Sequence, residues 1–305
     1  MVPPSDLMKR MEALNRRPLR DRAPERKDAD PPPEDREPPR KSRRPQQGPV
    51  MPTATLGDMP AGVIVESADA GAALLVTTDA DTYDPDCAGL SAKFREQVDD
   101  RESPFHRNVA RRGELSIRGV EDVLFVDLET TGLSNTPVFL IGAMVWDESG
   151  LSVRQYFARN LEEERAILSL FAELLSPATW LVTFNGKSFD WPFVQNRAYR
   201  HGVDVPFHGT HVDLLHVGRR AWGDSLPNCR LQTLERFICD RTREGDIPSS
   251  EIPAAYRRFT RTGDASEMAS VLEHNALDLI TLADLITRLP ADVARSAPRR
   301  RRSRR

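Results

Sequence analysis

Apolar residues change their spacing along the chain, and these changes divide it into predicted elements. Three largely apolar runs of strand length, joined by short polar links, predict strands that pair as an antiparallel meander. The runs are Asp122–Glu129, Val138–Asp147 and Leu151–Ala158. The turn Glu148-Ser149-Gly150 separates the second run from the third, which fits a tight antiparallel connection.

Strands and helices alternate after this meander. An acidic turn followed by apolar residues at helical spacing predicts the first helix. The predicted elements, in order, are a helix at Glu162–Leu175, a strand at Trp180–Phe184, a helix at Trp191–Arg200, a strand at Val212–Leu215, and helices at Leu231–Cys239 and Ser266–Leu289. This order predicts an α/β domain with a mixed, five-stranded sheet flanked by helices.

The segments outside this domain differ in composition. Residues 1–50 hold 11 of the 24 prolines and dense mixed charge, and residues 291–305 hold seven arginines, so we expect two disordered tails. Residues 51–115 show no clear period except two short apolar runs, Gly62–Val65 and Ala73–Val76, which predict a hairpin annex. The predicted domain covers residues 116–290.

Charge is distributed unevenly between these parts. The whole chain carries a net charge of −3, but residues 1–50 carry +4 and residues 290–305 carry +6, which leaves −13 on the rest. Flexible arginine-rich arms neutralise phosphates, so the tails serve either to hold a polyanion near the acidic domain or only to keep the chain in solution.

Composition excludes several classes of protein. The longest apolar run has nine residues, Val138–Trp146, far fewer than the about 20 that span a bilayer, so we expect no membrane partner. Three cysteines, Cys87, Cys229 and Cys239, form neither a disulfide framework nor a zinc pattern, and no disulfide-linked partner is expected. No apolar signal segment follows the charged N-terminus, and we expect a cytoplasmic protein.

Acidic residues occur where predicted strands end and on the last helix. Asp127 and Glu129 lie two apart on the first strand and share a face; Asp190 follows the fourth strand; His274 and Asp278 lie one helical turn apart. Taken alone, each has an ordinary explanation. Asp127 and Glu129 could be solvated, Asp190 could be a helix N-cap, and His274 and Asp278 could form a surface pair. Paired carboxylates on one face otherwise require a cation, and hard divalent ions bind carboxylate oxygens.

The acids belong to three motifs that occur in a characteristic order. The motifs are Val126-Asp127-Leu128-Glu129-Thr130-Thr131-Gly132, Asn185-Gly186-Lys187-Ser188-Phe189-Asp190 and His274-Asn275-Ala276-Leu277-Asp278. Together they resemble the DEDD-type 3′→5′ exonucleases of the RNase H-like superfamily, and more closely the YprB-type RNase H-like family. Asp246-Ile247-Pro248 and Ile252-Pro253-Ala254-Ala255-Tyr256 also resemble that family's connecting segment, and the whole resemblance covers residues 105–290.

The resemblance implies an RNase H-like fold and the hydrolysis of phosphodiester bonds in DNA or RNA. Asp127, Glu129, Asp190 and Asp278 would hold two Mg²⁺ or Mn²⁺ ions, which stabilise the attacking and leaving oxygens. His274, the fifth implied catalytic residue, would orient or deprotonate the attacking water. It lies four residues before Asp278, whereas these exonucleases place a tyrosine four residues or a histidine five residues before the last aspartate.

Other residues of the motifs are candidates for contact with nucleic acid. They are Thr130, Thr131, Asn185, Lys187 and Phe189. Phe189 could stack on a base and Lys187 could contact a phosphate; core packing and a solvated loop are the alternatives. Asp213, in the short fifth strand, is expected to be structural or to line the groove.

Three functions compete with the exonuclease. They are a non-catalytic nucleic-acid-binding module on the same fold, a structure-selective endonuclease on an RNase H-like core, and a structural protein whose acids are all solvated. Carboxylates that face phosphates argue against the binding module. The second and third motifs favour the exonuclease arrangement over the endonuclease.

Overall fold

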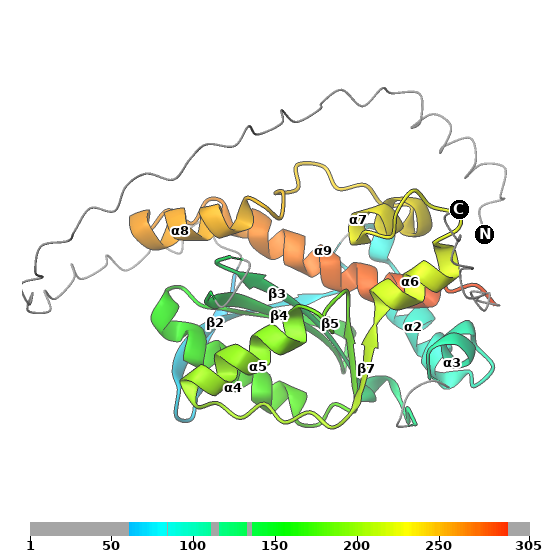
Figure 1. The fold of residues 1–305 in the computed structure, drawn as a ribbon, viewed down its shortest axis with the longest axis horizontal. Coiled ribbons are helices and arrows are strands. Elements are labelled where there is room, and N and C mark those ends of the chain that lie inside the picture. Colours follow the sequence, from blue (N-terminus) through cyan, green and yellow to red (C-terminus); the bar gives the residue numbers. More distant parts are fainter. Residues whose placement is uncertain (1–60, 84, 111–115, 133–135, 292–305) are drawn as a thin grey trace, which may run out of the picture. The chain divides into compact units, whose positions relative to one another are not determined.

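The computed structural model describes residues 61–83, 85–110, 116–132 and 136–291. The tail predicted at residues 1–50 and all but the first residue of the tail predicted at 291–305 lie outside the described residues, as do residues 51–60 of the predicted annex. From residue 61 onward, the described residues form one mixed sheet with helices on both of its faces (Figure 1). The α/β class expected from the sequence is therefore present.

The sheet has seven strands in the order β1-β2-β5-β4-β3-β6-β7. The strands are β1 (Val63–Ser67), β2 (Gly71–Asp79), β3 (Val123–Thr130), β4 (Val138–Asp147), β5 (Gly150–Phe157), β6 (Trp180–Thr183) and β7 (Thr210–Asp213). Neighbours from β1 to β3 are antiparallel, whereas β3, β6 and β7 are parallel. The meander and the parallel strands after it agree with the prediction.

The prediction of five strands is wrong, because the β1–β2 hairpin joins the same sheet. Strand β2 pairs with β5 from Leu74 opposite Phe157 to Asp79 opposite Ser152. A five-stranded sheet would leave β5 with a row of unpaired backbone groups, and the hairpin covers that edge. The two partners lie far apart in the sequence, so local hydrophobic spacing cannot reveal their pairing.

Eight α-helices occur in the described residues. They are α2 (Leu90–Asp99), α3 (Pro104–Asn108), α4 (Glu164–Leu175), α5 (Asp190–His201), α6 (Leu214–Trp222), α7 (Leu231–Leu234), α8 (Ile252–Thr262) and α9 (Met268–Thr287). Short 3₁₀ turns occur at Pro85–Cys87, Val120–Asp122 and Leu161–Glu163, and a π-helical turn at Glu235–Cys239 continues α7. Of these described helices, none is long and apolar enough to cross a membrane.

Several helices differ from the sequence prediction. Helices α2 and α3 occupy a segment in which no period was visible, and α8 occupies the connecting segment that begins at Ile252. The predicted strand Val212–Leu215 is two residues out of place, because β7 ends at Asp213. The Asp213 carboxylate accepts a hydrogen bond from the backbone N–H of Leu215 at 3.0 Å, which caps α6 and ends the strand.

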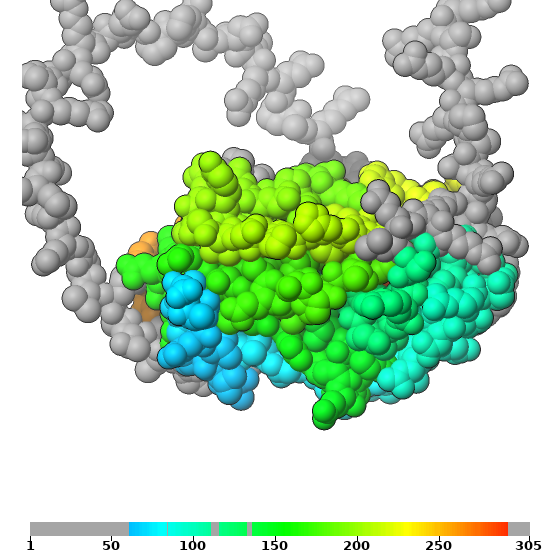
Figure 2. All heavy atoms as spheres, turned by 90° about the horizontal axis from the view of Figure 1, so that it is seen from below, coloured from blue at the N-terminus to red at the C-terminus, as the bar shows by residue number. Residues whose placement is uncertain are grey.

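Helices cover the sheet on both of its faces. Helix α4 packs on β1, β2, β4 and β5 with α5 beside it, whereas α9 crosses β3, β4 and β5 on the other face with α2 beside it. Figure 2 shows the α4–α5 face, with the β1–β2 hairpin in blue at one end and α2 and α3 in cyan at the other. The sheet is thus held between two layers, and its α9 face carries the acidic motifs.

A buried ion pair links the α4–α5 layer to the sheet. The carboxylate of Glu164, on α4, accepts hydrogen bonds from Arg197 Nε at 2.7 Å and from the backbone N–H of Val138 at 2.8 Å. It also lies 2.9 Å from His201 Nε2. Burial alone would raise the pKa of Glu164, but the hydrogen bonds from Arg197, Val138 and His201 outweigh it, and the pKa lies below its ordinary value. Glu164 therefore fastens α4, α5 and β4 together.

Replacing Glu164 by glutamine should destabilise the fold. We expect Glu164→Gln to lower the free energy of unfolding near pH 7 by about 3–5 kcal/mol, because Arg197 keeps a buried charge without its partner. Urea denaturation followed by circular dichroism measures this change. Glu267→Gln, which removes the exposed partner of Arg258, is the control and should stay close to wild type.

The stabilisation by Glu164 should depend on pH. Because its pKa in the folded chain is below the ordinary value of about 4.3, the stabilisation is complete above that pH and is lost as the pH falls through the folded pKa. The difference between wild type and Glu164→Gln should therefore shrink on acidification. Equal differences at about pH 7 and about pH 3 would contradict this assignment.

Candidate active site

The acidic motifs meet where the parallel strands end. Strands β3, β6 and β7 run in the same direction, so their carboxyl ends lie at one edge of the sheet, where α/β proteins place their ligands. Asp127 and Glu129 lie near the end of β3, Asp190 follows β6 as the first residue of α5, and Asp213 ends β7. Helix α9 crosses β3 and brings Asp278 to the same edge.

Mutual repulsion shapes the ionisation of the two acids on β3. Burial raises the pKa of Asp127 well above its ordinary value, and the charges of Asp278, Glu129 and Asp190 raise it further. Burial also raises the pKa of Glu129, with Asp278 and Asp190 adding to the effect. Both side chains keep some contact with solvent. The four acids therefore form one cluster in which negative charge is only partly compensated.

Asp190 completes this cluster from the loop after β6. Burial raises its pKa to about 7, with contributions from the charges of Asp213 and Asp278, although backbone N–H groups hydrogen-bond to its carboxylate. Helix α5 begins at Asp190, with Phe189 at the N-cap position and no side-chain cap. The N-cap explanation for Asp190 is therefore wrong, and its carboxylate faces the other acids instead.

Asp213 shapes the loop that carries Asp190. Its carboxylate accepts hydrogen bonds from the backbone N–H groups of Asn185 at 2.8 Å and Lys187 at 3.3 Å. Asn185 has a φ of 63°, in the left-handed region that asparagine tolerates. A Cβ on Gly186 would collide with Thr183 Oγ1 and lie 2.9 Å from Asp190 Oδ2. The Asn-Gly pair thus permits the tight turn that leads from β6 to Asp190.

His274 is buried behind Asp278. It is 2% exposed; its Nδ1 lies 2.8 Å from Asp246 Oδ1, and its Nε2 lies 3.3 Å from Ser249 Oγ and 3.7 Å from Asp278 Oδ2. A carboxylate only accepts hydrogen bonds, so Asp246 fixes the hydrogen on Nδ1 and leaves the lone pair on Nε2. The explanation of a surface His–Asp pair is therefore wrong. Sequence reasoning gave no role to Asp246 or Ser249.

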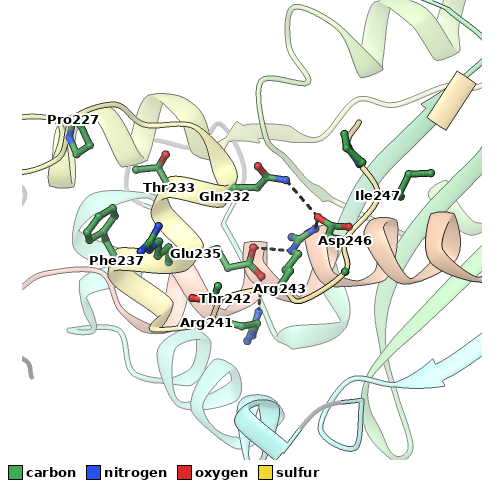
Figure 3. Close-up of a pocket in the computed structure, with 13 residues that line it drawn as sticks. Pro227, Gln232, Thr233, Glu235, Phe237, Arg241, Thr242, Arg243, Asp246 and Ile247 are labelled. Carbon is green, nitrogen blue, oxygen red and sulfur yellow. Dashed lines mark hydrogen bonds and ion pairs between the residues drawn. The ribbon is translucent and has the colours of Figure 1, made fainter. Parts of the chain in front are cut away.

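Arg243 is a further residue of the site that sequence reasoning missed. Its Nη2 lies 2.5 Å from Asp278 Oδ1, its Nε donates to Glu235 Oε2 at 2.8 Å, and its Nη1 lies 3.5 Å from Asp246 Oδ2. Figure 3 shows its side chain between Glu235 and Asp246. A single arginine in a polar segment carries no periodic signal, so only the folded chain identifies it. Asp278 is thus the one acid of the four with a cationic partner among the described residues.

The five candidates for nucleic-acid contact lie in two loops at this edge. Thr130 ends β3 and Thr131 follows it, and their hydroxyls donate to the backbone carbonyls of Gly132 and Pro137, respectively. Asn185, Lys187 and Phe189 lie between β6 and α5, where Lys187 is exposed and Phe189 is 59% exposed. Phe189 therefore does not pack in the core, which was its alternative role.

The donor atoms of the cluster suit a hard divalent cation. Asp127, Glu129 and Asp190 offer carboxylate oxygens, and their uncompensated charge is what such a cation would neutralise. Among the described residues, no three acidic, histidine or cysteine side chains already form a coordination shell. Side-chain rotation would therefore have to bring these oxygens together before they could coordinate a cation.

The model of the RNase H superfamily matches residues 124–290, which hold all the acids described above, and the chain belongs to this superfamily. It is similar to YprB of Bacillus subtilis, at 33% identity over 179 residues, which are 56% of this chain and 43% of YprB. This supports membership of the YprB-type RNase H-like family. The chain spans less than half the length of that relative.

Further similarities are more distant or more local. A protein of Methanocaldococcus jannaschii, MJ0365, is 26% identical over 161 residues, which are 50% of this chain and 87% of that protein. A family B DNA polymerase of Pyrobaculum calidifontis has a TM-score of 0.43 at 16% identity, over 53% of this chain and 24% of the polymerase. Exonuclease I of E. coli has a TM-score of 0.31 at 19% identity, over 48% of this chain and 42% of the enzyme.

Neutralising one buried acid should stabilise the metal-free protein. We expect Asp190→Asn to raise the melting temperature of the full chain in EDTA at about pH 8, by about 2–4 °C for each kcal/mol of repulsion relieved. Thermal denaturation measures the shift. Asp69→Asn, in the exposed turn between β1 and β2, is the control and should not change it. A lower melting temperature for Asp190→Asn would show that the hydrogen bonds of the Asp190 carboxylate stabilise the fold more than its repulsion from the other acids destabilises it.

Removing Arg243 should have the opposite effect. Arg243→Met removes the arginine partner of Asp278 and leaves the buried Glu235 with only the more distant Arg241, so we expect the free energy of unfolding to fall by about 3–5 kcal/mol. Arg258→Met breaks an ion pair whose members are both exposed and should change stability little. Chemical denaturation of both variants tests this difference. Equal effects would mean that the ion pairs of Arg243 contribute no more than a surface pair.

Proposed function

We propose that the chain is a divalent-metal-dependent nuclease, and specifically a 3′→5′ exonuclease that acts on DNA or RNA. The observation that carries this proposal is the convergence of Asp127, Glu129, Asp190 and Asp278 at the carboxyl ends of β3 and β6. A surface that only bound nucleic acid would gain nothing from carboxylates, which repel phosphates. A centre for phosphodiester hydrolysis requires them, because they hold the cations.

The four acids would hold two ions, Mg²⁺ or Mn²⁺. When bound, such ions neutralise the negative charge that develops on a phosphodiester during in-line displacement. The chain itself fixes the positions of the ligands: β3 presents Asp127 and Glu129 on one face, and the turn at Asn185 aims Asp190. Arg243 holds Oδ1 of Asp278, so Oδ2 is the oxygen left for a cation.

His274 would hold the attacking water at Nε2. Asp246 keeps the hydrogen on Nδ1, so Nε2 can accept a proton from that water. The hydroxyl of Ser249 lies 3.3 Å from Nε2, and the water would take its place. Asp246 acts through His274 and is a positioning residue in this scheme.

The substrate would enter over the two loops at the sheet edge. Phe189 is exposed directly before Asp190 and offers a ring for stacking on a base, and Lys187 offers a charge for a phosphate. Thr130, Thr131 and Asn185 line the same edge with polar groups. Beside Arg243 and Asp246 lies a cavity of about 570 Å³, a volume in the range that accommodates small-molecule ligands.

End-labelled oligonucleotides test the proposal. The full chain is incubated with single- and double-stranded DNA and RNA in Mg²⁺, Mn²⁺ or EDTA. We expect a 5′-labelled strand to give a ladder of shorter products and a 3′-labelled strand to release labelled mononucleotide, both only with metal. Asp127→Asn and Asp278→Asn should lower the rate by about a thousandfold or more, since metal catalysis is worth several kcal/mol. Asp69→Asn is the matched control and should remain active.

The same gels separate the competing functions. Internal fragments from both labels would mean an endonuclease. Mobility shifts of the oligonucleotides without any cleavage would mean a binding module. Cleavage that persists in Asp127→Asn would remove the acidic cluster from the mechanism.

A further inference from the structure

One row of residues crosses three strands beneath α9. Gln155 on β5, Gly142 on β4 and Asp127 on β3 are register partners, so they lie side by side across the sheet. Asn275 of α9 lies over Gly142 and is 0% exposed. A Cβ at position 142 would overlap the Asn275 amide group, so only glycine lets this side chain reach the sheet.

Hydrogen bonds fix the orientation of the Asn275 amide. Gln155 Nε2 donates to Asn275 Oδ1 at 2.9 Å and to the Leu272 carbonyl at 2.8 Å. Because Nε2 has only hydrogens to offer, the Asn275 oxygen must face Gln155 and its NH₂ group must face Asp127. That group donates to Asp127 Oδ2 at 2.8 Å and lies 3.3 Å from the Asp127 carbonyl oxygen.

We propose that Asn275 is a positioning residue for the metal centre, because it binds Oδ2 of Asp127 and leaves Oδ1 of that carboxylate to a cation. This inference rests on the proposed function, in which Asp127 ligates metal. Gln155 and Gly142 act one step further away: the first orients the amide and the second gives it room. Gln155, Gly142 and Asn275 are therefore distinct from the four acids and the histidine to which the resemblance assigns roles.

The chemical nature of Asn275 suits this role. An amide donates a hydrogen bond without a positive charge, so it orients Asp127 without neutralising it. Arg243 at Asp278 does both, since its guanidinium binds Oδ1 and also offsets the charge. The amide therefore adds no positive charge that would compete with a cation at Asp127, where Glu129 and Asp190 are also close. Partners that orient metal ligands in this way typically contribute 10–100-fold to metal affinity.

Binding of Mn²⁺ alone tests the inference without any turnover. The full chain, freed of metal with EDTA and dialysed, is titrated with Mn²⁺ by isothermal titration calorimetry. We expect Asn275→Ala to weaken binding about 10–100-fold. Asn196→Ala removes a helical asparagine that is exposed on α5 and bonded only to Arg200, and it should bind like wild type. In nuclease assays, excess Mn²⁺ should restore Asn275→Ala but not Asp127→Asn.

A second variant keeps the test decisive if Asn275→Ala does not fold. Gln155→Met keeps Asn275 and the volume of the side chain but removes the donor that orients the amide, so it should weaken Mn²⁺ binding in the same direction. Circular dichroism verifies that each variant is folded.

The outcomes distinguish this inference from the proposed function. Wild-type affinity in a folded Asn275→Ala, or in Gln155→Met where only that variant folds, overturns the role of Asn275 and leaves the nuclease proposal intact. If wild type and Asp127→Asn both fail to bind Mn²⁺, the metal centre itself is wrong, and the role of Asn275 falls with it.

Discussion

Electrostatic repulsion between neighbouring carboxylates is the constraint on which the rest of this structure depends. Asp127, Glu129 and Asp190 lie at one sheet edge, and burial together with the charges of neighbouring acids, Asp278 among them, raises the pKa of each. Such a cluster exists only where the backbone cannot move apart. Here β3 lies between β4 and β6, both of which pair with it, so the positions of its acids are set by two ladders of hydrogen bonds.

The chain compensates some of its buried charge and leaves the rest. Arg243 pairs with Asp278 and Glu235, and Arg241 pairs with Glu235 and Asp284, so two acids of α9 and one in the π-helical turn after α7 have cationic partners. The partner of Asp127, in contrast, is the neutral amide of Asn275, which donates a hydrogen bond but carries no charge. Negative charge thus accumulates at the ends of the parallel strands. The proposed metal centre depends on this local distribution more than on the net charge of −13 that residues 51–289 carry.

Segments outside the superfamily match also support the site. The match begins at residue 124, whereas β1, β2, α2 and α3 all precede it. Leu90, Phe94 and Val98 of α2 share an apolar core with Leu279 and Ile280 of α9. Because α9 carries Asn275 and Asp278, the packing of α2 holds these two side chains above the sheet. The annex is therefore part of what positions the centre.

The sequence by itself determined the central strands, four of the eight described helices and the four candidate acids. Strand-length apolar runs and helical spacing are local properties, and the motifs mark the ends of strands. The tertiary structure decided the rest: the pairing of β2 with β5, the ion pair of Arg243 with Asp278, and the approach of Asn275 to Gly142. Each of these joins residues far apart in the chain, and local spacing records nothing of a partner that only folding brings near.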